Sequence, residues 1–291
     1  MFLIRLLSRC PFWLLYGLSD FLFFVGYRVL GYRRKLVQKN LRNSFPNKTA
    51  LELHHIEKEF YKNLCDYAVE SLKLLSITKE ELAKRMIFKN PELIEYYKSI
   101  NQSIILLSSH QFNWEWLLVA GSFMLPVEID FVYQSVSSNF FDEVMQQART
   151  RFGAYPIQRD RVAREILKRK EKKRGIAIVA DQYPGYGRDK KYHATFLNQE
   201  TVFFYGCQHM AQLTQFPAIY AVITKVKRGY YECTLVTIGE PPYKKDSDNV
   251  VENYVRAVEK RIMEEPAGWL WSHNRWKKRH VAHQEETANQ I

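Results

Sequence analysis

The chain has 291 residues, which is enough for one large domain or two small ones with a well-buried core. Apolar residues make up 46% of it and charged residues 25%, a composition that excludes a disordered or collagen-like protein. The 43 Lys and Arg outnumber the 31 Asp and Glu, so the formal net charge is +12. The four cysteines form no C-x-x-C pair, which argues against a disulfide framework or a zinc ribbon and favours a reducing compartment.

The first 50 residues combine an apolar segment with most of the positive charge. They hold nine Lys or Arg and one acid, Asp20, and residues 11–27 carry only that single charge. The nine Phe, Leu and Val residues between Phe12 and Val25 favour insertion by roughly 3 to 5 kcal/mol, whereas a central Asp costs about 2.5 to 3.5 kcal/mol. The sequence therefore predicts that residues 1–32 form either a membrane anchor or an interfacial helix. A buried amphipathic core helix is the alternative. A secretory signal peptide is not expected, because the segment has no small-residue cleavage site.

Residues 33–100 are predicted to form a helical arm, because apolar residues from Phe60 to Leu72 recur at helical spacing. From residue 101 onward, short apolar runs alternate with longer amphipathic stretches, which predicts an α/β domain over 101–291. Its mixed, largely parallel sheet would be flanked by helices. The expected strands are 104–107, 129–133, 176–180, 218–223 and 233–238. The expected helices are 114–123, 139–149, 163–172, 202–213 and 250–264.

A basic run extends from residue 149 to residue 174, with eleven Lys or Arg and three acids. Most of it is predicted to be a solvated helix face over residues 160–172, with Glu165 one turn from Arg169. A nucleic-acid patch is the sharper alternative. No helix-turn-helix, RRM or zinc-finger signature accompanies the charge, so no nucleic-acid partner is expected.

The first strand of the α/β domain leads directly into a candidate active site. Residues 104–109 are apolar or small, and His110 follows them at the carboxyl end of the strand, where ligands gather in open α/β sheets. Glu115 comes five positions later, and Asn113 between them is a suitable N-cap for the following helix. If His110 lies in the turn, Glu115 can fix its tautomer while His110 acts as a general base. An H-x-x-x-x-E pattern alone is weak, and no G-x-S-x-G or H-E-x-x-H motif accompanies it.

At this point the sequence resembles the late acyltransferases of lipid A biosynthesis, the lauroyl and myristoyl transferases that act on the Kdo-bearing precursor. These enzymes belong to a wider H-x4-D/E superfamily that includes the glycerophosphate acyltransferases. The resemblance covers nearly the whole chain, and the segments that carry it are the N-terminal apolar segment, K-N-L-R-N-S-F-P at 39–46, S-H-Q-F-N-W-E at 109–115, A-D-Q at 180–182, F-L-N-Q-E-T at 196–201, Pro266 and W-L-W-S-H-N-R-W-K at 269–277. The last block is close to the family's W-x-H-R-R-F-K and is the most specific part.

Two departures from the family pattern leave the chemistry of the site intact and bear on the identity of the acceptor and of the acyl chain. Gln111 and Phe112 stand where a Phe-Gly pair is common, and Asn274 and Trp276 stand where Arg and Phe are usual.

The resemblance implies a glycerolphosphate-acyltransferase-like fold and an O-acyltransferase that uses an acyl carrier protein thioester. The acceptor would be a hydroxyl of a lipid A precursor at the cytoplasmic face of a cell inner membrane. His110 would be the base and Glu115 its partner, with no cofactor, metal or covalent acyl-enzyme required. The resemblance leaves the oligomeric state open.

Further residues are expected to contact substrate. Arg151 could hold an acceptor phosphate or the donor's phosphopantetheine, and its plainer alternative is a surface charge. Asp181 and Gln182 follow a strand and could line the same cleft, although Asp181 could equally be a helix cap. The remaining candidates, which could close the site or simply pack the C-terminal segment, are Trp271, His273 and Arg275.

Two rival functions remain open from the sequence. One is an acyltransferase of the same family that acts on another acceptor, such as an aminolipid or a pigment hydroxyl. The other is a non-catalytic protein of the membrane surface that keeps the fold. His193 and His209 have no partner at a suitable spacing and are expected to be structural.

Overall fold

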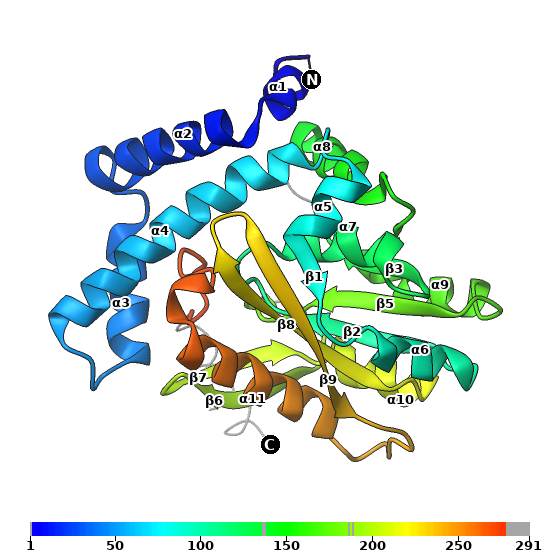
Figure 1. Ribbon diagram of the computed structural model, residues 1–291. Coiled ribbons are helices and arrows are strands. Elements are labelled where there is room, and N and C mark those ends of the chain that lie inside the picture. The colour runs from blue at the N-terminus through cyan, green and yellow to red at the C-terminus, as the bar shows by residue number, and fades with distance from the viewer. Residues whose placement is uncertain (1, 136–137, 186, 188, 278–291) are drawn as a thin grey trace.

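The computed structural model describes residues 2–135, 138–185, 187 and 189–277, and it shows a mixed α/β sheet between two layers of helices (Figure 1). Within these residues, seven strands form the main sheet in the order β1-β9-β8-β2-β5-β3-β4, and all neighbours are parallel except β8 and β9. The strands of this sheet are β1 (Met86–Phe88), β2 (Ile104–Ser108), β3 (Glu128–Tyr133), β4 (Tyr155–Gln158), β5 (Arg174–Val179), β8 (Ala218–Lys227) and β9 (Tyr230–Gly239). The predicted fold class is confirmed.

Two apolar cores lie on opposite faces of this sheet. One contains side chains of α3 (Arg34–Ser44), α4 (Ala50–Lys73), α10 (Gly206–Thr214) and α11 (Asn249–Glu264). The other contains side chains from the region of α5 (Lys79–Arg85), α6 (Glu92–Ser99), α7 (Trp114–Met124) and α8 (Asn139–Thr150). Successive residues of β2 alternate between the cores, Ile105 and Leu107 in the first and Ile104 and Leu106 in the second, as the pleat of a strand covered on both faces requires.

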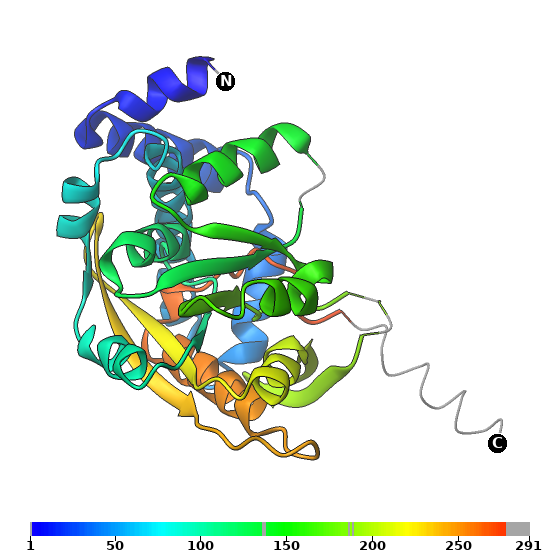
Figure 2. The same cartoon turned by 90° about the vertical axis from the view of Figure 1, so that its right-hand side faces the viewer.

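The N-terminal segment consists of α1 (Phe2–Arg9), α2 (Phe12–Phe23) and the π-helical turn η1 (Phe24–Val29). The stretch Phe12–Val29 is long and apolar enough to cross a membrane by length and composition. In the structure α2 lies along α4, and Figure 2 shows α1 and α2 at the same end of the molecule as α8. The side chain of Arg5 in α1 donates to that of Gln147 in α8 (3.1 Å). The alternative of a buried core helix is not what the structure shows, because Trp13, Phe21 and Phe24 are exposed.

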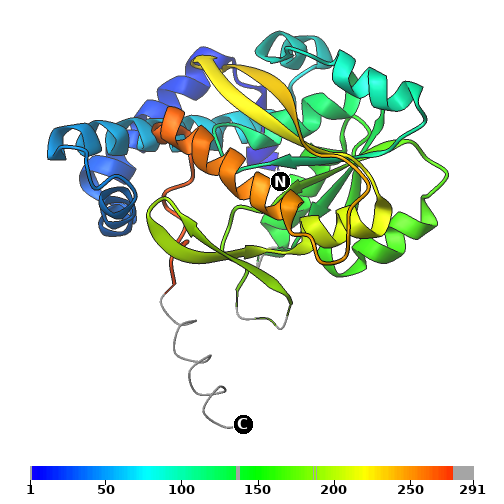
Figure 3. The same ribbon diagram turned by 90° about the horizontal axis from the view of Figure 1, so that it is seen from below.

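A two-stranded antiparallel hairpin lies apart from the main sheet, beside α11 (Figure 3). It is formed by β6 (Lys191–Phe196) and β7 (Gln199–Phe204). The sequence predicted a helix over 202–213, and this is wrong for residues 202–204, which complete β7, because α10 begins only at Gly206. Val202 and Phe203 are both buried in the hairpin, opposite His193 and Tyr192 of β6, so the apolar residues that suggested a helix are explained by the packing of a strand instead.

The other predicted elements are confirmed with small shifts at their ends. The sequence did not indicate β6 of the hairpin, nor two short strands at the edges of the main sheet. Residues 86–88 of the predicted helical arm form β1 and join the sheet, and residues 155–158 form β4. The predicted helix 163–172 is shorter, since α9 (Val162–Lys168) follows the turn η2 (Arg159–Arg161) and ends four residues early. The domain boundaries at residues 32 and 100 stay predictions.

Candidate active site

The turn that carries His110 lies between β2 and α7, as the sequence predicts. Asn113 is the N-cap of α7, and its side-chain oxygen accepts a hydrogen bond from the backbone N–H of Trp116 (2.9 Å). The Tyr254 hydroxyl from α11 donates to the carbonyl of Ser108 (2.8 Å) and accepts from the N–H of Ala180 (3.1 Å). The carboxyl ends of β2 and β5 are therefore fixed to each other by one buried phenol.

His110 is paired with Asp181, which is 71 positions further along the chain. Nδ1 of His110 lies 2.6 Å from Oδ1 of Asp181, and the backbone N–H of His110 donates to Oδ2 (3.0 Å). The strand register explains the meeting, because Ser108 of β2 is opposite Val179 of β5 and each partner stands two residues beyond. The geometry gives Asp181 the orienting position that was expected for Glu115.

Asp181 is buried at 1% exposure, and three groups hold its negative charge. Trp269 Nε1 donates to Oδ2 (2.7 Å), in addition to the two contacts with His110. Burial acts to raise the pKa of Asp181, but the His110 imidazole and these hydrogen bonds outweigh it and hold the pKa below its ordinary value. The carboxylate is therefore ionised at neutral pH and keeps the proton of the imidazole on Nδ1.

Glu115 forms a different pair, and this corrects the expected contact with His110. Its two oxygens accept from Nε (2.7 Å) and Nη2 (2.6 Å) of Arg149, a residue of α8, in a bidentate arrangement. Trp114 Nε1 also donates to Glu115 (3.2 Å), and the Trp114 ring lies edge to face with His110 at 4.9 Å. Glu115 can therefore act on the site through Arg149 and Trp114, whereas its catalytic role stays a prediction.

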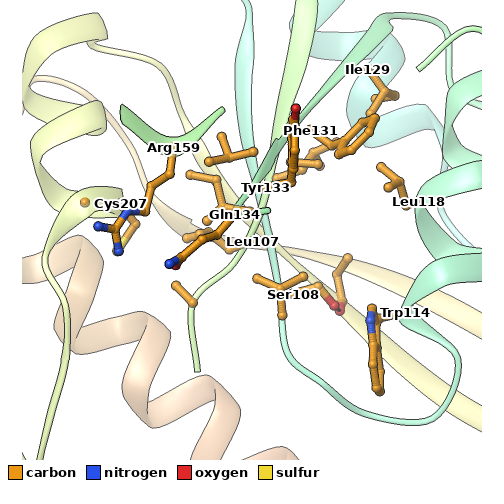
Figure 4. Close-up of a pocket in the computed structure, with 18 of the residues that line it drawn as sticks. Leu107, Ser108, Trp114, Leu118, Ile129, Phe131, Tyr133, Gln134, Arg159 and Cys207 are labelled. Atoms are coloured by element: carbon orange, nitrogen blue, oxygen red, sulfur yellow. Dashed lines mark hydrogen bonds between the residues drawn. The ribbon is translucent and has the colours of Figure 1, made fainter. Parts of the chain in front are cut away.

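A cavity of about 750 Å³ opens at His110, and its wall is mostly apolar. His110, Glu115 and Arg149 all border it. Figure 4 shows Leu118, Ile129 and Phe131 on one side of the cavity and Gln134 and Arg159 on the other. One side could hold a hydrocarbon chain, and the other offers polar groups for a headgroup or carrier.

The structure separates the other predicted contacts into two groups. Gln182 borders the cavity, in agreement with its expected place at the end of a strand. Arg151 lies elsewhere: its guanidinium donates to the carbonyl of Leu74 and lies over the Phe152 ring (4.8 Å). This position does not support a contact between Arg151 and a substrate, which stays a prediction.

The three predicted residues of the C-terminal segment pack beneath the site and are not part of the cavity wall. Trp271 is fully buried against Trp269 with ring centroids 4.8 Å apart, and its Nε1 donates to the Pro266 carbonyl (2.7 Å). Burial lowers the pKa of His273 to about 4, so its neutral Nε2 accepts from the N–H of Tyr183 (3.1 Å). Arg275 is also fully buried, and its Nη1 donates to Thr201 Oγ1 (2.8 Å).

The departure at position 112 places a side chain where the backbone of the turn favours glycine. Phe112 has φ of +46°, a backbone conformation that favours glycine and strains a side chain. Its N–H donates to the carbonyl of Gly268 (2.8 Å), and a Cβ added to Gly268 would lie 2.5 Å from the Phe112 ring. The absence of a side chain at Gly268 thus provides the space for Phe112.

Arg149 and Trp269 are the two site residues whose roles the sequence reasoning missed. Arg149 was noted only as the first residue of the basic run and the end of the predicted helix 139–149, and Trp269 was quoted only as part of a motif. Trp269 lies in an apolar stretch and Arg149 in a polar one, and no spacing connects either residue with His110. Among the described residues, no group of three or more His, Cys, Asp or Glu is placed to hold a metal ion.

The family model described as bacterial lipid A biosynthesis acyltransferase matches residues 1–278. No curated protein matches the chain.

Proposed function

Because the chain belongs to the family of bacterial lipid A biosynthesis acyltransferases, we propose that it transfers a fatty acyl chain from an acyl carrier protein thioester to a hydroxyl of a lipid A precursor. The observation that carries this proposal is the pair His110–Asp181 at the opening of a mostly apolar cavity. An oriented imidazole beside a space for a hydrocarbon chain is what acyl transfer to an alcohol requires.

In the proposed mechanism His110 is the general base. With the proton held on Nδ1 by Asp181, Nε2 of His110 takes the proton of the acceptor hydroxyl as its oxygen attacks the thioester carbonyl carbon. The C–S bond then breaks, and the leaving thiolate takes the proton from the imidazolium. Asp181 stabilises the imidazolium that forms between these steps. General base catalysis of this kind contributes about 10² to 10⁴ in rate.

Arg149 can stabilise the negative charge of the tetrahedral intermediate. Its guanidinium borders the cavity, and its two contacts with Glu115 fix the plane of the group. This arrangement assigns Glu115 a positioning role, in which it holds Arg149 in place and keeps its charge compensated.

The acyl chain would extend from His110 into the apolar part of the cavity. This part lies between α7 and the sheet, and its walls include Phe88, Leu106, Leu117, Leu125 and Leu235. A thioester carbonyl near His110 would then leave its carrier outside, where the polar side of the cavity opens toward Gln134 and Arg159.

We propose that the enzyme acts at the cytoplasmic face of a cell inner membrane, with its N-terminal helices in the interface. The exposed apolar side chains of this segment would face lipid; they are Leu3, Leu6, Trp13, Leu14, Phe21, Leu22, Phe24, Val29, Leu30 and Tyr32. Asp20 does not need to enter the bilayer, because Arg228 of the β8–β9 hairpin pairs with it at 2.7 Å. This pairing favours a helix that lies on the protein body over one that spans the membrane alone.

The experiment compares the lipid A of a strain lacking the gene with that of the same strain carrying a variant. Wild type should restore one acyl chain by mass spectrometry, His110→Ala should not, and His193→Ala, an exposed histidine on β6, is the matched control. Restoration by His110→Ala would exclude this histidine as the base and favour a non-catalytic role. A gene deletion that changes another lipid class instead would assign a different acceptor.

A further inference from the structure

A second buried carboxylate is hydrogen-bonded to the turn that carries His110, at a different residue of the turn from Asp181. Glu70 of α4 is fully buried, and Oε2 accepts hydrogen bonds from Asn113 Nδ2 (2.7 Å) and the Tyr231 hydroxyl (2.8 Å). Oε1 accepts from the hydroxyl of Tyr16 (3.0 Å), a residue of α2. We propose that Glu70 is a positioning residue that sets the first turn of α7 through Asn113 and connects the N-terminal apolar helix with the active site. This inference rests on the proposed function, because it assigns the turn carrying His110 to catalysis.

The orientation of the Asn113 amide depends on Glu70. The amide oxygen must face the N–H of Trp116 to cap α7, and the amide nitrogen then faces Glu70. If the amide turned over, its oxygen would meet the carboxylate and its N–H₂ would meet an N–H, so both hydrogen bonds would be lost. Asn113 is fully buried, so water does not replace either partner. Glu70 therefore selects the one orientation in which the cap forms between His110 and Glu115.

A second contact holds Glu70 to the same helix. The Trp116 indole N–H donates to the Glu70 backbone carbonyl (2.8 Å), so both the side chain and the backbone of Glu70 bind the first turn of α7. A movement of α4 at this residue would be passed to Asn113 and Trp116 together.

Two hydrogen bonds about one turn apart hold α2 to α4, and the two carboxylates that accept them have different further partners. Tyr16 donates to Glu70 and so is connected with Asn113. Ser19 donates to Asp66 (2.7 Å), whose other partners are Lys225 and Arg228; Arg228 in turn lies over the Tyr16 ring (4.6 Å). Both hydrogen bonds are made by a hydroxyl of α2 to a buried carboxylate of α4, so they form a matched pair for an experiment.

The tip of the β8–β9 hairpin leaves room for the Tyr16 phenol. Gly229 has φ of +73°, and a Cβ added there would overlap the Tyr16 hydroxyl. The hairpin thus covers part of Tyr16 without displacing it from Glu70.

The test compares Tyr16→Phe with Ser19→Ala in the purified full-length enzyme, with dodecanoyl acyl carrier protein and a Kdo-bearing lipid A precursor as substrates. Tyr16→Phe should lower kcat about tenfold with KM unchanged. This is less than the roughly 10²-fold loss that follows when a reacting group is misplaced by 1 Å, because Tyr16 acts on the turn only through Glu70. Ser19→Ala should leave kcat within about twofold of wild type, although it removes a comparable contact. In a Glu70→Gln background the Tyr16→Phe change should cost less than it does alone, because both changes act through one group.

A second measurement does not depend on the substrates. Hydrogen exchange of the backbone N–H of Trp116 and its neighbours should be faster in Tyr16→Phe than in Ser19→Ala, because only the first change loosens the Asn113 cap. Equal exchange in the two variants, or equal kcat values, would overturn the positioning role of Glu70. His110→Ala is run in the same assays: full activity of that variant would overturn the proposed mechanism, while the exchange data would still decide the role of Glu70.

Discussion

Two buried carboxylates bind the turn that carries His110, and their surroundings shift their pKa values in opposite directions. Asp181 meets an imidazole and an indole N–H, and its pKa is lowered despite complete burial. Glu70 meets only neutral donors from Asn113, Tyr231 and Tyr16, and burial raises its pKa to about 7. Burial alone therefore does not decide the charge of a carboxylate in this protein. The imidazole beside Asp181 can become a cation, which makes this carboxylate suitable for catalysis. Glu70 has only neutral hydrogen-bond donors and is suited to a structural role.

Asp181→Asn is expected to give the largest effect on activity. The amide can present an N–H to His110 Nδ1, which would move the imidazole proton to Nε2 and remove the base. We expect kcat to fall by about 10² to 10⁴ with little change in the folded structure. Steady-state kinetics of acyl transfer, with circular dichroism as the control for folding, would measure this. Activity within about threefold of wild type would show that Asp181 does not orient the base.

The contrast also bears on Glu115, the third carboxylate near the turn, which has a full cation as partner. Arg149→Gln removes that cation and leaves Glu115, at 2% exposure, with an uncompensated charge. Removing one partner of a buried ion pair lowers the free energy of unfolding by about 3 to 5 kcal/mol. Because Arg149 is partly exposed, solvent screens the pair, and we expect a loss near the lower end of this range. Urea unfolding in detergent would measure it.

The control for this change is a variant that removes both charges. Arg149→Gln with Glu115→Gln should recover part of the lost stability, because no unpaired charge remains. Acyl transfer should stay low in the double variant if Arg149 stabilises the intermediate. Recovery of both stability and full activity would mean that the pair has only a structural role.

The sequence predicted the local parts of this site and missed the long-range ones. The strand over 104–107, the turn with His110 and the Asn113 cap follow from hydrophobic runs and capping chemistry over ten residues, and the structure has each of them. The partner of His110 depends on β2 and β5 being neighbours in register, and nothing in the sequence around either strand states their order in the sheet. The pairing of Glu115 with Arg149 depends in the same way on how α8 packs beside α7.

The spacing H-x-x-x-x-E therefore indicated the position of the cavity correctly but suggested the wrong contact, between His110 and Glu115. Both side chains border the cavity, yet the helix that begins at Trp114 directs Glu115 toward α8. The edge strands β1 and β4 were missed for a related reason, because three or four residues are too few for a period to be recognised.

The last predicted effect concerns Glu70, and it is a dependence of stability on pH. Its pKa of about 7 in the folded protein lies above the ordinary value of 4.5, so between these two values the folded state binds the proton more tightly than the unfolded chain. The free energy of unfolding should therefore fall as the pH rises from 4.5 to 7, by about 3 kcal/mol for this group. The titratable groups that face Glu70 are Tyr16, Tyr231 and Asp66.

Glu70→Gln removes this titration and keeps the shape of the side chain, so the difference in stability between variant and wild type isolates the group. The variant should gain stability relative to wild type as the pH is raised from 5 to 8, and chemical unfolding at several pH values would measure the gain. Asp181 titrates in both proteins and contributes nothing to the difference, which is why the comparison is made at Glu70. A difference that stays constant over this range would mean that Glu70 keeps an ordinary pKa, and the contrast with Asp181 would then disappear.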